Sequence, residues 1–479
     1  MNQLSVTNPR NGIQDYNVPV IDREVVAEKA RRLRSAQPLW ARDSERRVAV
    51  LETWADALDQ HSSALAQALE KDTGRRLLSV LEARSMIDRI RYWTGRLPSL
   101  ISENQGVVPT EAANVTAHQQ LVPYSLVGII SPWNFPLTLA LVDAIPALCA
   151  GCAVLLKPSE VAPRFAEVLD RSLADVPELR EIFAVITGDA STGKAIVDNV
   201  DMLCFTGSVA TGREVAVQAA QNFIPVCLEL GGKDPAVVLE DADLDAAADA
   251  ILRSAAGSCG QACMSIERIY VHEKQASDFM QRLSKRAADQ TFNQPDISRG
   301  TLPPFIDQRQ AQKVAAQLEE AVHKGAKILC GGPPQQLDGG YWMAPTILTK
   351  ASHDMSVMRE ETFGPILPVM TFLNDDEAIS LANDSDYGLS GSVFGEKSHA
   401  IAVAQKLDVG AVGINDASMT ALIFDVEKQS FKSSGMGPSR MGDSSLLRFY
   451  RRKALLVQNG TPAPLAVLDE AGLANFGQR

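Results

Sequence analysis

The feature that most constrains the fold is a regular alternation of short apolar strands and helical segments that begins at Leu126. Each short aliphatic run is followed by a longer segment in which apolar side chains recur every three or four positions. Strands separated by helices form a parallel sheet covered on both faces, as in dinucleotide-binding domains. We therefore expect strands over 127–130, 153–156, 183–186, 202–205 and 226–229, and helices over 136–150, 164–174, 193–199 and 212–221.

A second α/β pattern follows the glycine pair Gly231–Gly232 and continues to about residue 430. It begins with a predicted strand at 236–239, a helix at 243–256 and a strand at 268–271. A chain of 479 residues is too long for one hydrophobic core. We expect two lobes that meet near the glycine pair, with a ligand-binding cleft between them.

The segment before this alternation has a different pattern. Residues 21–100 predict long helices, over 24–33, 44–60 and 62–73, with Gly74 as a stop signal. Residues 113–124 are rich in β-forming side chains of alternating polarity and predict an exposed strand or hairpin.

Charge and cysteine content exclude several classes of function. The 46 Lys and Arg residues against 58 Asp and Glu give a net charge of −12, which disfavours nucleic acid and anionic membranes as partners. There is no membrane-spanning apolar run, and residues 1–16 lack the apolar core of a signal peptide. We expect a cytoplasmic protein whose seven cysteines are reduced. Because the Cys149–Cys152 pair has no partner pair and the histidines are dispersed, we expect no metal site.

Three residues have side chains suited to catalysis. Asn134 lies between two prolines that would hold its backbone and aim its amide at an oxyanion, although a packed turn would use the same residues. Glu229 ends an apolar strand, so it either faces a cleft or forms a salt bridge. Cys263 follows a glycine-containing turn and could attack a carbonyl as a thiolate, or could be a small buried residue.

A glycine-containing turn at 205–212 follows a predicted strand and opens a predicted helix. Glycine lets the backbone approach a phosphate, and the free N–H groups of the helix start bind it. The turn is not a P-loop, since no Lys-Ser/Thr pair follows Gly212. Many strand–helix turns contain glycine, so this motif alone does not identify a nucleotide site.

Together these motifs resemble the aldehyde dehydrogenase superfamily, in the family's order from about residue 20 to 458. The interval of 34 positions from Glu229 to Cys263 also agrees with the family. The matching motifs are Pro-Trp-Asn-Phe-Pro (132–136), Lys-Pro-Ser-Glu (157–160), Phe-Thr-Gly-Ser (205–208), Glu-Leu-Gly-Gly-Lys (229–233), Gly-Gln-Ala-Cys (260–263) and Glu-Thr-Phe-Gly-Pro (361–365).

The resemblance implies NAD-dependent oxidation of an aldehyde to a carboxylic acid. Cys263 would attack the aldehyde, the Asn134 amide and the Cys263 N–H would hold the oxyanion, and Glu229 would activate the water that hydrolyses the thioester. Because a carboxylate at Glu160 accepts ribose hydroxyls and repels a 2′-phosphate, we expect NAD rather than NADP. The implied cofactor-binding residues are Trp133, Lys157, Glu160, Gly207, Ser208, Glu361 and Phe363.

The substrate tunnel is less well defined. Its mainly apolar expected lining favours an apolar aldehyde, aromatic aldehydes included, over a dicarboxylic semialdehyde. One departure affects this region: residues 427–430 read Glu-Lys-Gln-Ser where the family usually has Pro-Phe-Gly-Gly, so Lys428 or Gln429 could serve a polar substrate. By position, the residues bordering the tunnel are Phe135, Leu139, Val142, Ala262 and Met264.

The resemblance also implies an α/β fold with a Rossmann-like coenzyme domain, a second α/β catalytic domain and a small β arm for oligomerisation. We expect a homodimer or homotetramer, because an exposed ribbon is unstable alone. The expected boundaries are 1–106 and 125–231 for the coenzyme domain, 232–435 for the catalytic domain, 107–124 and 440–458 for the arm, and 459–479 for a C-terminal tail.

Three alternatives remain. A CoA-acylating semialdehyde dehydrogenase shares the fold, but such relatives generally lack the base found here at Glu229. A non-catalytic structural protein would typically lose part of the site, whereas Cys263, Glu229 and Asn134 are all present. A thiol esterase would leave the nucleotide-binding motifs unexplained.

Overall fold

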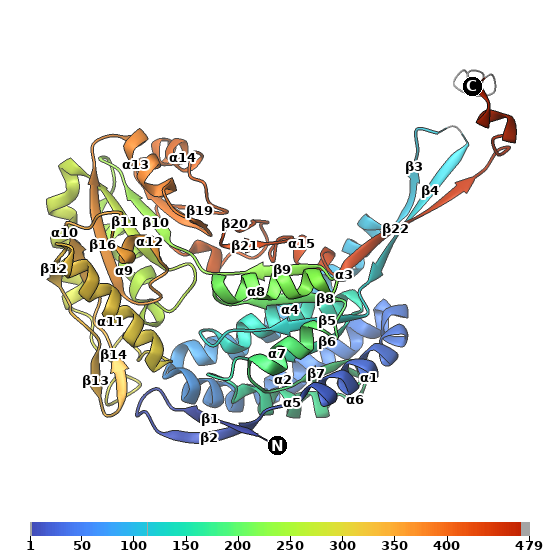
Figure 1. Ribbon diagram of the computed structural model, residues 1–479, viewed down its shortest axis with the longest axis horizontal. Helices are drawn as coiled ribbons and strands as arrows, with labels where there is room; N and C mark the ends of the chain where they lie inside the picture. The colour runs from blue at the N-terminus through green and yellow to red at the C-terminus, as the bar shows by residue number, and fades with distance from the viewer. Residues whose placement is uncertain (1, 113, 471–479) are drawn as a thin grey trace.

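Two largely parallel sheets organise the chain, one in each lobe, in a computed structural model that describes residues 2–112 and 114–470 (Figure 1). The first lobe has a six-stranded sheet in the order β21-β9-β8-β5-β6-β7, in which only β21 is antiparallel to its neighbour. Its strands are β5 (Leu126–Ile130), β6 (Ala153–Lys157), β7 (Phe183–Val185), β8 (Met202–Thr206), β9 (Val226–Glu229) and β21 (Gly435–Met436).

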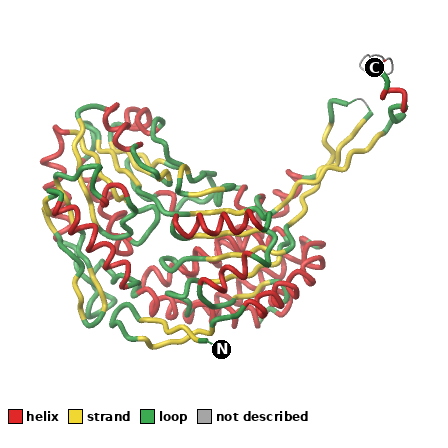
Figure 2. Tube along the Cα trace, in the orientation of Figure 1, coloured by secondary structure: helices red, strands yellow, loops and turns green. Residues whose placement is uncertain are grey.

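Helices pack on both faces of this sheet (Figure 2). Gly74 ends α2 in the left-handed conformation, and its N–H donates to the Glu70 carbonyl at 2.8 Å. The break predicted at residue 61 is absent, because Ser62 turns its hydroxyl to the Asp59 carbonyl of the same helix. The helices are α1 (Arg23–Arg42), α2 (Ser44–Thr73), α3 (Arg76–Asn104), α4 (Pro136–Ala150), α5 (Phe165–Ala174), α6 (Pro177–Arg180), α7 (Ala190–Val197) and α8 (Val209–Gln221).

The second lobe has a seven-stranded sheet in the order β12-β15-β16-β11-β10-β18-β19, parallel except for β12. The strands are β10 (Asp234–Val238), β11 (Ile266–His272), β12 (Lys327–Cys330), β15 (Thr346–Thr349), β16 (Ile366–Phe372), β18 (Gly391–Phe394) and β19 (Val412–Ile414). The helices are α9 (Leu244–Ala256), α10 (Glu273–Ala288), α11 (Gln308–His323), α12 (Ser356–Arg359), α13 (Asp375–Asn383) and α14 (Lys397–Ala404). This pair of α/β lobes confirms the predicted fold class.

Small antiparallel pairs complete the lobes. The N-terminal hairpin of β1 (Gln3–Thr7) and β2 (Gln14–Pro19) was not predicted, because its polar sequence buries only alternate residues such as Val6 and Val18. The other pairs are β13 (Gln335–Leu337) with β14 (Gly340–Trp342), and β17 (Tyr387–Gly388) with β20 (Phe431–Lys432).

A three-stranded antiparallel arm projects from the first lobe (Figure 1). It consists of β3 (Gly106–Pro109), β4 (Val115–Pro123) and β22 (Tyr450–Gln458). Residues 440–449, which were expected in the arm, pack instead on the first lobe: α15 (Ser444–Leu447) lies against α4, and Leu446 and Phe449 are fully buried in that core. Position 113 of the arm and 471–479 of the tail lie outside the described residues.

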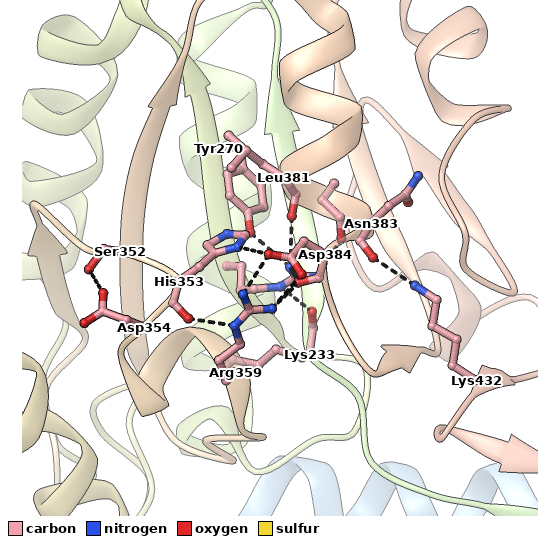
Figure 3. Close-up of polar contacts among 12 residues, drawn as sticks. Lys233, Tyr270, Ser352, His353, Asp354, Arg359, Leu381, Asn383, Asp384 and Lys432 are labelled. Carbon is pink, nitrogen blue, oxygen red and sulfur yellow. Dashed lines mark hydrogen bonds and ion pairs between the residues drawn. The ribbon is translucent and has the colours of Figure 1, made fainter.

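The link between the lobes at 230–233 is held by Arg268 of β11, which is buried. Its Nε donates to the Lys233 carbonyl at 2.8 Å and its Nη2 to the Ala382 carbonyl at 2.8 Å. Around it, the Tyr270 hydroxyl contacts His353 at 2.9 Å, and His353 contacts Asp384 at 2.6 Å (Figure 3). This network fixes the start of β10 against α13.

Two general features of the described part bear on function. None of its helices combines the length and apolar character needed to cross a membrane. In the same residues, no group of three or more His, Cys, Asp or Glu side chains is arranged to hold a metal ion.

Candidate active site

A cavity of about 180 Å³ brings together residues of both lobes. The first lobe contributes the segments that follow β5, β8 and β9, and the second lobe contributes Cys263, the start of α11 and the segment before β16. The predicted residues that line this cavity are Cys263, Glu229, Asn134, Trp133, Gly207, Ser208, Glu361, Phe363 and Leu139.

Asn134 is buried, and its side-chain amide points at the loop that carries the cysteine. Its Nδ2 donates to the Gln261 carbonyl oxygen at 3.0 Å. The buried Arg75 donates to the Asn134 carbonyl and to the Ser258 hydroxyl, so one guanidinium connects the Asn134 turn to the cysteine loop. An amide in this position can donate a hydrogen bond to negative charge that develops beside Cys263.

The loop before Cys263 has an unusual backbone. Ser258, Cys259 and Gly260 all have positive φ, at 56°, 57° and 69°. Left-handed backbone costs roughly 1–2 kcal/mol for a residue with a Cβ, so other contacts must hold this turn. The buried Gln261 side chain supplies them, since its Nε2 donates to the Ser258 carbonyl at 2.9 Å and its Oε1 accepts from the Ile306 N–H at 2.9 Å.

Cys263 is half-buried, and its thiol is protonated near neutral pH. Burial raises the pKa of this thiol to about 12. Lys428 opposes that shift, whereas the carboxylates of Glu361, Asp234 and Glu229 add to it. A thiol in this state needs a base before it attacks a carbonyl.

Glu229 is the last residue of β9 and lies two positions before Gly231. Its Oε2 accepts a hydrogen bond from the Ser430 hydroxyl at 3.0 Å. A Cβ on Gly231 would lie 2.5 Å from Glu361 Oε1, and one on Gly232 would lie 2.6 Å from the Cys263 carbonyl oxygen. Glycine is therefore required at both positions, because the lobes approach each other across this link.

Phe363 and Trp133 form one wall of the cavity. Their rings meet edge to face, with centroids 5.4 Å apart. Phe363 has a φ of 55°, and its N–H donates to Glu267 Oε1 at 2.7 Å. Lys233 in turn binds Glu267 Oε2 at 2.7 Å, so a buried ion pair fixes the position of the Phe363 ring.

The first-lobe sheet offers a dinucleotide site at the carboxyl ends of its strands. β5 lies between β8 and β6, so the strand order reverses there, which is where such sheets bind ligands. Ser208 caps α8 beside β8, and its hydroxyl accepts from the Thr211 N–H at 3.3 Å. Lys157 ends β6 and is buried, with Nζ 3.3 Å from Glu160 Oε2. A buried ammonium, a carboxylate and an open helix start fit a ribose and a pyrophosphate.

Lys157 and Glu160 do not line the 180 Å³ cavity. Glu160 instead borders a larger cleft of about 740 Å³ between the N-terminal hairpin and the start of α11. Burial lowers the pKa of Lys157, and Glu160 acts against this shift.

Of the five residues expected to border the tunnel, only Leu139 lines the cavity beside Cys263. Phe135 packs under Arg75, 4.8 Å from the guanidinium carbon, and Val142 is buried within α4. Met264 binds Thr420 and Ser418, and those two residues line a separate cavity of about 300 Å³. Met264 therefore connects the cysteine loop to the wall of this second cavity.

A comparison with protein-family models identifies the family. The model described as "Aldehyde dehydrogenase family" matches residues 1–455. The chain belongs to the aldehyde dehydrogenase family. It is therefore an oxidoreductase that acts on aldehydes with NAD(P), as the motifs predicted.

Individual relatives agree with this assignment. A Mycolicibacterium smegmatis protein provisionally named succinate-semialdehyde dehydrogenase [NADP(+)] is 34% identical over 90% of this chain and 84% of its own. The solved structure of PutA from Anabaena variabilis is 45% identical, with a TM-score of 0.95 over 97% of this chain and 99% of that one. Betaine aldehyde dehydrogenase from Staphylococcus aureus, solved with NAD+, is 29% identical, with a TM-score of 0.88 over 96% and 92% of the two chains.

Several residues of this aldehyde dehydrogenase site were not found from the sequence. Gln310 and Lys313, on the first turns of α11, donate to the carbonyls of Thr362 and Glu361 at 2.7 Å each and line the cavity. Their spacing of three positions on an amphipathic helix is the only sequence signal they give. Arg75 has no local signal, because its partners are distant in sequence.

Proposed function

We propose that the chain oxidises an aldehyde to the carboxylic acid with NAD as hydride acceptor, through a thioester on Cys263. The observation that carries this proposal is that one interlobe cavity presents the Cys263 thiol, the Glu229 carboxylate and the Asn134 amide. These three groups supply a nucleophile, a base and an oxyanion donor.

In the first half-reaction, Glu229 takes the thiol proton and Cys263 Sγ bonds to the aldehyde carbon. The resulting oxyanion is stabilised by the Asn134 amide, whose Nδ2 already points at the cysteine loop. Collapse of the thiohemiacetal expels the aldehyde hydrogen as hydride, which the nicotinamide accepts when the cofactor is bound. The product on the protein is a thioester of Cys263.

Glu229 first releases the thiol proton to solvent. In the second half-reaction, it removes a proton from water while the water oxygen bonds to the thioester carbon. The C–S bond then breaks, the acid leaves, and the cysteine takes up a proton again. One aldehyde, one water and one oxidised cofactor thus give one acid, one reduced cofactor and one proton.

We propose NAD rather than NADP as the preferred cofactor. The Glu160 carboxylate beside Lys157 supports this preference, because it accepts hydrogen bonds from ribose hydroxyls and repels a 2′-phosphate. Comparable kcat/KM values with the two cofactors would contradict it.

We propose that the aldehyde has an apolar body, aromatic aldehydes included. Support comes from Leu139 beside Cys263 and from the 300 Å³ cavity beyond Met264. The apolar residues of that cavity include Val412, Met419, Ile423, Val426 and Met441. A kinetic panel of benzaldehydes, straight-chain aldehydes and succinate semialdehyde tests this, and clear preference for the last would overturn it.

We further propose a homodimer or homotetramer assembled through the arm, in the cytoplasm. Exposed apolar side chains on the ribbon support assembly, among them Val107, Leu455 and Leu456. All seven cysteines are free, which supports a reducing compartment. Sedimentation as a monomer at micromolar concentration would contradict the assembly.

The reaction is tested by NADH formation in single-turnover and steady-state experiments. Cys263→Ala should form no NADH. Glu229→Gln should form at most one NADH per site and then stop, because its thioester is not hydrolysed. Continued turnover of Glu229→Gln, or formation of an acyl-CoA in place of the acid when CoA is added, would overturn the proposal.

A further inference from the structure

A buried cluster of charges lies beneath Glu229, and no motif of the sequence indicated it. Asp143 of α4 is 1% exposed and binds two guanidinium groups. Arg440 Nη2 lies 2.9 Å from Asp143 Oδ2 and its Nε 3.2 Å from Asp143 Oδ1, so the pair is bidentate. Arg448, which is also 1% exposed, binds Asp143 Oδ1. Arginine makes such two-point contacts with a fixed geometry.

Arg440 also connects this cluster to the active-site cavity. Its Nη2 also donates to the hydroxyl of Thr206, which is the register partner of Glu229 across β8 and β9 and lines the 180 Å³ cavity. On the other side of Glu229, Gly435 of β21 is its register partner. Arg440 follows β21 after only a short connection, so the same segment supplies Ser430, which binds the Glu229 carboxylate, and Arg440, which binds the neighbouring Thr206.

The cluster is not electrically neutral by itself. Two guanidinium groups face one carboxylate, and within the described residues Arg440 and Arg448 form ion pairs only with Asp143. An excess buried charge is costly unless another charge compensates it. Burial alone lowers the pKa of Arg440, but Asp143 and then Glu229 raise it, and the balance lies above the usual arginine value. The Glu229 carboxylate is therefore attracted to the excess positive charge.

We propose that Ser430 and Arg440 are positioning residues for Glu229 in this reaction: the Ser430 hydroxyl fixes one carboxylate oxygen, and Arg440, anchored by Asp143 and bound to Thr206, orients the carboxylate by charge attraction for hydrolysis of the thioester. This inference rests on the proposed role of Glu229 as the base. It assigns a function to the 427–430 segment that departs from the family motif, since the glycine usual at position 430 has no side-chain donor for this hydrogen bond.

Other titratable groups face Glu229 and must be separated from Arg440. The Cys204 thiol hydrogen-bonds to Cys227 and lowers the pKa of Cys227 to about 7, against burial and with help from Arg448. Within the residues that the structure describes, Cys227 is thus the other group that could carry the compensating negative charge. In the cavity itself the facing groups are Cys263, Glu361 and Lys313, and Lys428 acts on Cys263 from the Ser430 segment.

The test compares the NADH burst with steady-state turnover in full-length variants for which such a burst shows that hydrolysis limits the rate. Arg440→Met should keep the burst but lower steady-state kcat several-fold, because Glu229 loses the charge that orients it. Asp143→Asn removes the anchor of Arg440 and should have the same effect. Arg440→Lys keeps the charge and should restore most of the steady-state rate.

Ser430→Ala should lower steady-state kcat several-fold without reducing the burst. It therefore tests the hydrogen bond if Arg440→Met does not fold, as circular dichroism would show. The matched control is Arg213→Met, an exposed arginine whose Nη2 contacts only Ser433 at 3.1 Å, and it should behave as wild type.

The outcomes are distinguishable. If Arg440→Lys turns over as slowly as Arg440→Met, or if neither differs from wild type, the charge role is wrong. If Cys227→Ser lowers steady-state kcat as Arg440→Met should, the compensating anion is Cys227 and the proposal is overturned. If Glu229→Gln turns over normally, the proposed function itself fails, whatever the arginine variants do.

Discussion

The Asn134 amide nitrogen donates to the Gln261 carbonyl oxygen at 3.0 Å, which ties the turn after β5 to the loop that carries Cys263. The proposed oxyanion donor is thus held against the loop of the proposed nucleophile, across the two lobes. A donor held in this way loses little orientational freedom when charge develops on the substrate.

Replacement of this amide should slow chemistry and leave cofactor binding intact. We expect Asn134→Ala to lower kcat by about 10²–10³-fold, the usual effect of removing one oxyanion donor. The dissociation constant of NAD, measured by fluorescence titration, should stay within about twofold of wild type. A kcat loss below tenfold would show that the Cys263 N–H suffices as the donor.

The high pKa of Cys263, about 12, predicts how the free enzyme reacts with iodoacetamide. Because the thiolate fraction rises about tenfold per pH unit below the pKa, the alkylation rate should climb through pH 10 without a plateau. Lys428→Met removes the one cation that favours the thiolate and should slow alkylation at every pH in this range. A plateau below pH 9 in the wild type would contradict the expectation, and Cys263→Ser gives the background from other cysteines.

Position 231 leaves no room for a side chain, since a Cβ added to Gly231 would lie 2.5 Å from Glu361 Oε1. In Gly231→Ala we expect Glu361 to be displaced from the Gly232 N–H, 3.3 Å away, and the KM for NAD to rise more than tenfold. Gly257→Ala is the matched control, because a Cβ there meets no described atom within 4 Å. Equal cofactor KM values in the two variants would exclude this role for Glu361.

The network around Asp384 predicts a pH-dependent contribution to stability. Hydrogen bonds from Arg359 and His353 hold the pKa of Asp384 well below its usual range, against the effect of burial. A carboxyl with a lowered folded-state pKa stabilises the fold above its unfolded value of about 3.9, and this contribution is lost as the pH falls toward the folded value.

Asp384→Asn should therefore lower the free energy of unfolding in urea equally at pH 7 and pH 5, and by less near pH 3. Asp386→Asn is the control, since the described residues give Asp386 no ion pair. A difference between wild type and Asp384→Asn that grows on acidification would contradict this assignment.

Local patterns predicted most of the architecture. Alternating apolar runs gave β5, β6, β8 and β9 nearly to the residue, because buried parallel strands leave a continuous apolar signal. The predicted nucleophile, base and amide meet in one cavity because parallel strands end at a common edge. The N-terminal hairpin left no such signal, since it buries only a few side chains.

Contacts between distant segments could not be read from the chain. Asp143 and Arg440 are 297 positions apart, and neither lies in a recognisable pattern. Phe135 was expected beside the substrate, but Arg75 occupies its ring face. Val142 was expected there too, yet α4 is buried on nearly every side and Val142 lies within its core contacts.

The return of the chain to the first lobe at β21 has a mechanical consequence. The backbone crosses between the lobes once near Gly231 and again near Ser434, and the two crossings are joined where the Leu230 N–H donates to the Ser434 carbonyl at 2.9 Å. Two adjacent connections allow the lobes to rotate about one axis and resist their twisting about the others. Glu229 lies next to this axis of rotation. Opening of the cleft for cofactor exchange would therefore displace Glu229 less than residues farther from the axis.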